Sequence, residues 1–306
     1  IMGNVAVEVT NDMITYSTDK REFEFVQSTQ LLSITPSSGP PVGGSEVIVR
    51  GSDFSYSNSL YCQFCDQWSE AAFISVSEVR CVTPPHSLGL CPVQISVNRV
   101  DTIGENQLFF GYSSLPEISS FSPTAGPVSG GTLIHIEGKH MNEKTMCKFG
   151  SMALIKPENV SNDSITCRSP KVSSLRNLRL RLTNNMVDLS YDTTTFRFYD
   201  SLYIHKISPS TGPQRGGSRV SIWGINFVNS RFLGCKFGAK IVDAIWISET
   251  KIECSAPQNS PGVYFVEVSN NGQQFSQNKR SFTVYPNTEI FGIQPKSGRT
   301  LGGTLI

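Results

Sequence analysis

The sequence has no run of apolar residues long enough to span a membrane and no excess of positive or negative charge. No stretch holds 18 consecutive apolar residues, and neither an initiator Met nor a signal-like apolar segment stands at position 1. Only 17% of residues are charged, and 26 basic residues nearly balance 25 acidic ones, for a formal net charge of +1. Because no basic surface would hold a polyanion, we expect no nucleic-acid partner. We expect contact with a membrane only through regions outside these residues.

Motifs for catalysis and cofactor binding are also missing. The chain has no HExxH, no nucleophile-elbow Ser, no Gly-rich loop that opens a helix, and no acidic residues at calcium-loop spacing. Its four histidines, His86, His135, His140 and His205, stand at unrelated places, and His135 is expected on the outward face of a strand. We therefore predict that the protein is not an enzyme and holds no cofactor and no catalytic metal.

One pattern recurs four times and sets the architecture. Its Gly-Gly pairs begin at residues 43, 130, 216 and 302, so the steps are 87, 86 and 86 residues. An apolar residue, a Pro and a Gly precede each pair at fixed spacing: Ile34, Pro36 and Gly39; Phe121, Pro123 and Gly126; Ile207, Pro209 and Gly212; Ile293, Pro295 and Gly298. A fixed period of this length indicates a tandem array of similar domains.

Within each period the residues alternate as half-buried strands do. Val47 and Val49 fall on one face of a strand, and Glu46 and Arg50 fall on the other. A phenylalanine two residues after a Cys recurs at Phe64, Phe149 and Phe237 and is assigned to the core. Short strands, frequent turn residues and the absence of helix-type apolar stripes predict an all-β fold of tandem immunoglobulin-like antiparallel β-sandwiches in a linear array.

Six of the eight cysteines follow the same period. The second and third copies hold two each at matching places, so each pair is expected to bridge its own sandwich. The predicted disulfides are Cys62–Cys81, Cys147–Cys167 and Cys235–Cys254, with Cys65–Cys91 as an extra bridge in the first copy. Cys62-x-x-Cys65 is half of a zinc site by spacing, but no second pair completes it, so we predict no metal site. Intradomain disulfides predict an extracellular or cell-surface location.

The recurring residues resemble a known family. Pro-x-x-Gly-Pro-x-x-Gly-Gly, then Cys-x-Phe-Gly, then a Cys followed three residues later by Pro, is similar to the IPT/TIG domain of plexins, the hepatocyte growth factor receptor and fibrocystin-like surface proteins. The first copy departs from it, because Cys65 replaces the Gly after Phe64. The resemblance covers essentially the whole chain and implies a non-catalytic extracellular protein.

The offsets between copies predict the domain boundaries. Val7 matches Val266 at an offset of 259 residues, which is the sum of the three steps, so residues 1–28 are expected to be the C-terminal part of a preceding IPT/TIG domain. Residues 29–113, 114–200 and 201–286 would be three complete domains, and 287–306 the N-terminal part of a following one. The linkers, such as the five residues between Tyr112 and Ile118, are too short for free tumbling, which predicts a semi-rigid array.

Two Asn-x-Ser triplets at Asn159 and Asn162 are N-glycosylation candidates on a turn expected to be exposed.

Two structural functions compete. The first is a stalk, fibre or filament that presents surface for adhesion or assembly, which the uniformity of the repeats favours. The alternative is the ectodomain stalk of a plexin-like or growth-factor-receptor-like receptor. The expected partners are neighbouring repeats of the same protein, which includes assembly into a homopolymer, and other extracellular proteins or glycans.

Overall fold

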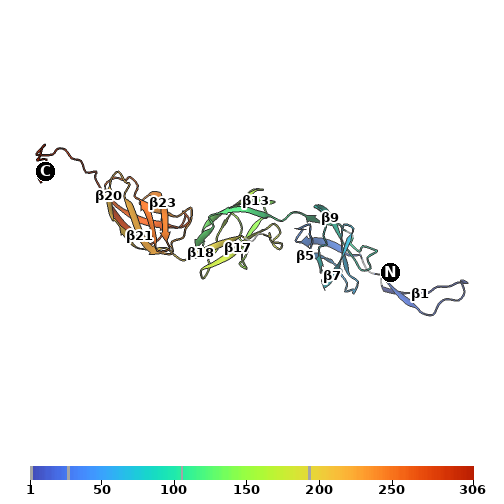
Figure 1. Cartoon of the computed structure of the whole chain (residues 1–306). Coiled ribbons are helices and arrows are strands. Elements are labelled where there is room, and N and C mark those ends of the chain that lie inside the picture. Colours follow the sequence, from blue (N-terminus) through green and yellow to red (C-terminus); the bar gives the residue numbers. More distant parts are fainter. Residues whose placement is uncertain (1–2, 26–27, 105, 192–193) are drawn as a thin grey trace. The chain divides into compact units, whose positions relative to one another are not determined.

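The protein is all-β, as predicted. The structure, a computed structural model, describes residues 3–25, 28–104, 106–191 and 194–306. These residues form strands joined by turns and contain no helix (Figure 1). It follows that no helix in the described ranges is long and apolar enough to cross a membrane. Residues 3–25 hold only an antiparallel hairpin of β1 (Gly3–Val7) and β2 (Arg21–Phe25).

Three repeats of eight strands follow this hairpin. The first repeat consists of β3 (Gln30–Thr35), β4 (Ser38–Gly39), β5 (Glu46–Ser52), β6 (Tyr61–Phe64), β7 (Gln67–Ser75), β8 (Glu78–Val82), β9 (Gly89–Ser96) and β10 (Leu108–Tyr112). The second consists of β11 (Glu117–Ser122), β12 (Ala125–Pro127), β13 (Leu133–Lys139), β14 (Met146–Phe149), β15 (Asn159–Val160), β16 (Ser164–Arg168), β17 (Arg176–Thr183) and β18 (Thr195–Tyr199). The third consists of β19 (Tyr203–Ser208), β20 (Thr211–Pro213), β21 (Arg219–Ile225), β22 (Gly234–Phe237), β23 (Lys240–Ser248), β24 (Lys251–Ser255), β25 (Gly262–Ser269) and β26 (Arg280–Tyr285).

The first and third repeats share one strand order. In the first repeat it is β3-β5-β8-β7-β6-β9-β10-β4, and in the third it is β19-β21-β24-β23-β22-β25-β26-β20. The long strand β7 pairs with β6 through residues 67–70 and with β8 through residues 71–75, so it passes from one sheet of the sandwich to the other. The short strand β4 pairs parallel to β10 and β20 parallel to β26, which places the segment before each Gly-Gly pair at a sheet edge.

The second repeat has the same two layers as separate sheets of order β11-β13-β16-β15 and β12-β18-β17-β14. Backbone contacts divide the whole chain into two units. Residues 1–120, 137–165 and 181–193 form the first unit, and residues 121–136, 166–180 and 194–306 form the second.

Each core is filled by the residues that the period selected. Val47 and Val49 of β5 are fully buried, whereas Glu46 and Arg50 on the same strand are exposed. The recurring phenylalanines are also buried: Phe64 lies 5.8 Å from Phe110, and Phe237 lies 5.3 Å from Phe282, both edge to face. Edge-to-face packing is a favoured geometry for aromatic pairs in a core.

The Gly-Gly pairs are turns that enter a strand. Gly216 and Gly217 have φ angles of 76° and 84°, a region that residues with a Cβ rarely adopt. A Cβ on Gly216 would stand 2.6 Å from the backbone nitrogen of Gln258, whereas a Cβ on Gly217 would meet no atom within 4 Å. The first glycine is therefore required both by backbone conformation and by space, and the second by conformation alone.

This difference predicts unequal effects of alanine at the two glycines. Gly217→Ala is expected to cost about 1–2 kcal/mol for the left-handed backbone. Gly216→Ala is expected to cost a further ~1–3 kcal/mol because its methyl group would overpack the backbone. Chemical denaturation of both variants checks this, and equal losses of stability would contradict it.

Candidate functional site

The cysteines form bridges inside the repeats. Cys62 is bonded to Cys81, Cys65 to Cys91, and Cys235 to Cys254. Cys147 and Cys167 are each disulfide-bonded as well, and no described cysteine is free. Cys62 and Cys235 lie on the strands β6 and β22, and their partners lie on β8 and β24 in the opposite sheet, so these bridges join the two layers of the sandwich.

One group of metal-ligating residue types gathers in the described residues. The sulfurs of Cys65 and Cys91 and a ring nitrogen of His86 lie within 4.8 Å of one another. Because the two sulfurs are bonded to each other, neither is the thiolate that a zinc ion binds. The imidazole instead packs 5.1 Å from the ring of Tyr112, and its Nδ1 lies 2.9 Å from the carbonyl oxygen of Ser87. This arrangement is that of a packed surface histidine beside a disulfide.

The two glycosylation candidates lie on one exposed turn. Asn159 begins β15, and Asn162 lies in the turn that leads to β16; both side chains are exposed. Ser161, the hydroxyl residue of the first triplet, donates a hydrogen bond to Asp163, and its oxygen lies 2.8 Å from that of Ser164.

We predict that at least one of these asparagines carries a glycan when the protein is secreted from eukaryotic cells. Only two residues lie between them, so one glycan is expected to hinder the second sterically. Peptide mass spectrometry of the wild type, Asn159→Gln and Asn162→Gln checks this. Unmodified peptides in all three proteins would contradict the prediction.

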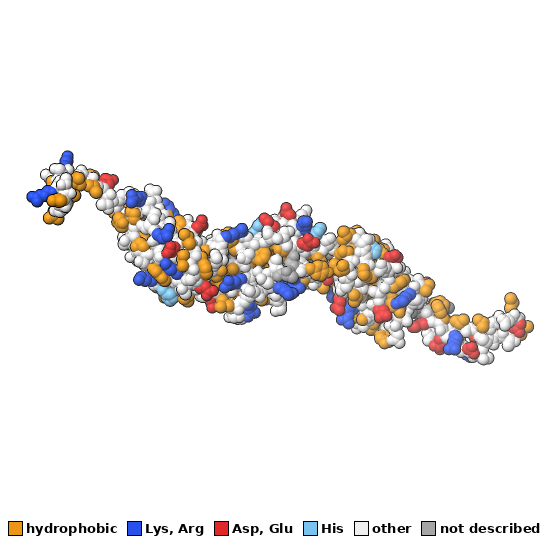
Figure 2. Space-filling view, in the orientation of Figure 1, with side chains coloured by type: hydrophobic (Ala, Val, Ile, Leu, Met, Phe, Trp, Pro, Cys, Tyr) orange, Lys and Arg blue, Asp and Glu red, His pale blue; other side chains and the backbone are white. Residues whose placement is uncertain are grey.

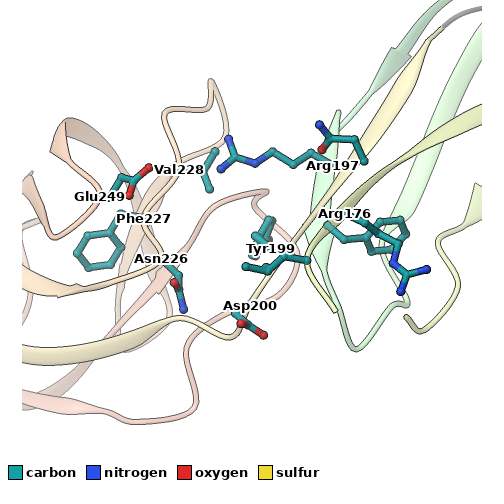
Figure 3. Close-up of a pocket in the computed structure, with 11 residues that line it drawn as sticks. Arg176, Arg197, Tyr199, Asp200, Asn226, Phe227, Val228 and Glu249 are labelled. Atoms are coloured by element: carbon teal, nitrogen blue, oxygen red, sulfur yellow. The ribbon is translucent and has the colours of Figure 1, made fainter. Parts of the chain in front are cut away.

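A crevice of about 440 Å³ lies in the second unit (Figure 3). It is lined by residues of β17 and β18 and by loops of the third repeat: Leu175, Arg176, Asn177, Arg197, Phe198, Tyr199, Asp200, Asn226, Phe227, Val228 and Glu249. Arg176 and Arg197 contribute positive charge, and Asp200 and Glu249 contribute negative charge, so the lining carries no excess of either sign. The crevice therefore favours neither an anion nor a cation.

Tyr199 lies near the centre of this crevice (Figure 3) and is 4% exposed. Its hydroxyl has no hydrogen-bond partner in the described residues, and burial raises its pKa above the usual range. Tyr112, the last residue of β10 in the first repeat, donates to the carbonyl oxygen of Pro84, and burial raises its pKa to about 12. Both tyrosines end the last strand of their repeat, where the next repeat begins.

A polar turn between the last two strands of the second repeat contacts the first repeat, within the first unit. The carboxylate of Asp188 accepts a hydrogen bond from the hydroxyl of Ser45 at 2.6 Å. The side-chain amide of Asn185 donates to the carbonyl oxygen of Ser38 at 2.7 Å. Ser45 directly follows a Gly-Gly pair, and Ser38 belongs to the short edge strand β4.

The equivalent turn of the third repeat makes the equivalent contact in the second unit. The hydroxyl of Thr132, which follows the next Gly-Gly pair, donates to the side-chain oxygen of Gln274 at 2.9 Å. The side-chain amide of Asn271 donates to that hydroxyl at 3.2 Å, and Gln273 exchanges two hydrogen bonds of 2.8 Å with the backbone of Leu133.

Sequence reasoning missed these turns, although the signal was present. Asn98, Asn185 and Asn271 recur at 87 and 86 residues, the same steps as the Gly-Gly pairs. All three asparagines close a turn, and Asn185 and Asn271 also reach the preceding repeat.

The rest of the surface is mixed in character. On the face shown in Figure 2, Lys and Arg side chains are interspersed with Asp, Glu and hydrophobic ones, and no large patch has a single sign. Pairs such as Arg50 with Glu78, 2.8 Å apart, neutralise one another locally.

Comparisons with known proteins give a consistent result. A family model described as "IPT/TIG domain" matches residues 28–112, 116–198 and 202–284. Human Fibrocystin-L is 27% identical over 90% of this chain and 7% of its own length, and mouse Plexin-A2 is 28% identical over 84% of this chain and 15% of its own length. The extracellular region of Plexin A4 is a structural neighbour with 19% identity and a TM-score of 0.46, covering 91% of this chain and 26% of that one.

The chain thus spans only a small part of the relatives it matches. Its location is extracellular or at the cell surface, as the disulfides predicted.

Proposed function

Because this chain belongs to the IPT/TIG domain family, we propose that it is a non-catalytic part of the ectodomain of a cell-surface receptor. The observation that carries the proposal is the run of three consecutive family matches, shared with plexin and fibrocystin-like relatives over 84–90% of the chain. The uniform repeats favoured a stalk, fibre or filament, with a receptor ectodomain as the alternative. These relatives support the alternative better.

In this function the repeats are spacers. The first and third repeats each have a core cluster and a bridge between their sheets, so we expect each of them to keep its shape without its neighbours. The short connections between Tyr112 and Ile118 and between Tyr199 and Ile204 limit the relative motion of successive repeats. Neighbouring repeats, other extracellular proteins and glycans are the partners we propose for the exposed surfaces; nucleic acid is not.

The test locates the native protein on the cells that make it. We expect surface biotinylation to label it, detergent to be needed to release it, and electron microscopy to show membrane-tethered particles. Filaments released without detergent, with an axial repeat set by one domain, would instead establish a structural polymer and overturn the receptor proposal.

A further inference from the structure

All three repeats contain the same side-chain-closed turn. In the first repeat the Oδ1 atom of Asn98 accepts the backbone N–H groups of Val100 and Asp101, both at 2.9 Å, and its Nδ2 donates to the Asp101 carboxylate at 3.1 Å. Asn185 closes the turn of the second repeat on Val187 and Asp188, and Asn271 closes that of the third on Gln273 and Gln274. The turn forms in the first repeat without a preceding complete repeat, so it is preorganised.

Burial of the turn depends on what precedes the repeat. Asn271, which contacts Thr132, is 2% exposed, and Asn185, which contacts Ser38, is half-buried. Asn98 has the same internal hydrogen bonds, yet it is exposed. The first repeat therefore presents a complete but uncovered copy of the turn.

The edge that receives the turn shows the matching difference. The hydroxyl residues after the first two Gly-Gly pairs, Ser45 and Thr132, are 1% and 0% exposed, whereas the equivalent Ser218 of the third repeat is only half-buried. Tyr199, which pairs with Pro127 at the end of the second repeat, is 4% exposed, whereas the equivalent Tyr285, which pairs with Pro213 in the third repeat, is 43% exposed. The third repeat therefore presents an uncovered copy of the edge.

The chemistry of the contact restricts what fits. A carboxylate or carboxamide oxygen of the turn accepts the hydroxyl of Ser or Thr, and an apolar residue there would leave the buried acceptor without a partner. A glycine beside the hydroxyl is also needed: a Cβ on Gly39 would clash with Ser45 Oγ and stand 3.2 Å from the carboxylate of Asp188. At Gly39 the absence of a side chain therefore leaves room both for the hydroxyl of Ser45 and for the carboxylate of the docked turn.

We propose that the Asn-x-x-[Asp/Gln] turn of each repeat is a docking element for the Gly-Gly-[Ser/Thr] edge of the repeat before it. The Asn98–Asp101 turn and the Ser218 edge are then two halves of the same joint, and each takes a further IPT/TIG repeat. This inference does not rest on the proposed function, because a receptor stalk and a filament would use the same joint.

The first experiment compares two matched variants of the 306-residue chain by ¹⁵N relaxation. Asn185→Ala/Asp188→Ala removes an occupied turn, and Asn98→Ala/Asp101→Ala removes the same residues from an uncovered one. We expect the first variant to let the first repeat tumble faster than in the wild type. The second is expected to leave its relaxation rates unchanged. Ser45→Ala, which removes only the receiving hydroxyl, is expected to act in the same direction as the first variant.

The second experiment joins the two uncovered halves. A copy of residues 201–285 replaces residues 1–26, which keeps the spacing of the repeats and puts a Ser218 edge directly before the Asn98–Asp101 turn. In this longer chain Asn98→Ala/Asp101→Ala is expected to change the relaxation rates, because it uncouples the added repeat from the next.

Two results would overturn the proposal. One is an equal effect of both double variants in the 306-residue chain, which would mean that the turn acts only within its own repeat. The other is that Asn98→Ala/Asp101→Ala leaves the relaxation rates of the longer chain unchanged. Circular dichroism of each variant confirms that the repeats remain folded, and neither result bears on where the protein resides in the cell.

Discussion

Phe237→Ala is expected to lower the free energy of unfolding of the third repeat by about 3–5 kcal/mol, the range for deleting a fully buried phenylalanine. The ring is 1% exposed on β22, packs edge to face on Phe282, and belongs to the same core cluster as Cys235 and Cys254. Its removal leaves a cavity between two sheets that the disulfide prevents from collapsing freely. The loss should therefore fall in the upper part of that range.

Tryptophan fluorescence during chemical denaturation separates the repeats. Trp223 and Trp246 lie in the third repeat and Trp68 lies in the first, and the second repeat has no tryptophan. The fluorescence of the first and third repeats can therefore be assigned separately. We expect the Phe237→Ala transition seen at Trp223 and Trp246 to move to lower denaturant, with the Trp68 transition unchanged.

Phe265→Ala is the matched control for this variant. Phe265 lies on β25 of the same repeat, but its ring is 54% exposed on the outer face of the sandwich and contacts the ammonium group of Lys279 at 5.9 Å. Little apolar surface is lost there, so we expect a change below ~1 kcal/mol. Similar losses for the two variants would mean that the period does not identify the core.

The period made the core readable from the sequence alone. Phe64, Phe149 and Phe237 recur at one place in every copy, and a position kept apolar in three sandwiches faces inward in all of them. The strands after the Gly-Gly pairs followed in the same way, since alternation of apolar and polar residues fixes which face is buried.

Features that depend on contacts distant in sequence were not readable. β7 passes from one sheet to the other between Glu70 and Ala71, and a register shift follows between Phe73 and Ser75; no residue type marks either. The contact of Asp188 with Ser45 joins residues 143 positions apart, and a lone Asp in a loop looks the same whether solvated or docked. The burial of Tyr199 follows only from the start of the next repeat.

Removing the bridge between the sheets of the first repeat is expected to destabilise that repeat more than removing its second bridge. In the chain-entropy model the Cys62–Cys81 disulfide, with a sequence separation of 19 residues, contributes on the order of 3 kcal/mol. The separation of 26 for Cys65–Cys91 predicts a slightly larger entropic contribution. Loop length alone would therefore rank the second bridge as equal or stronger.

Packing reverses this ranking. Cys62 and Cys81 are 0% and 1% exposed and join opposite sheets, so Cys62→Ala/Cys81→Ala also removes two sulfurs from the core. Cys65 is half-buried and Cys91 is 0% exposed on β9, which already pairs with β6, so Cys65→Ala/Cys91→Ala removes one fully buried sulfur and a cross-link within one sheet. Denaturation followed at Trp68 should show the larger loss for the first pair. Equal losses, or a larger loss for the second pair, would mean that loop closure and not the buried sulfurs determines how strongly each bridge stabilises the repeat.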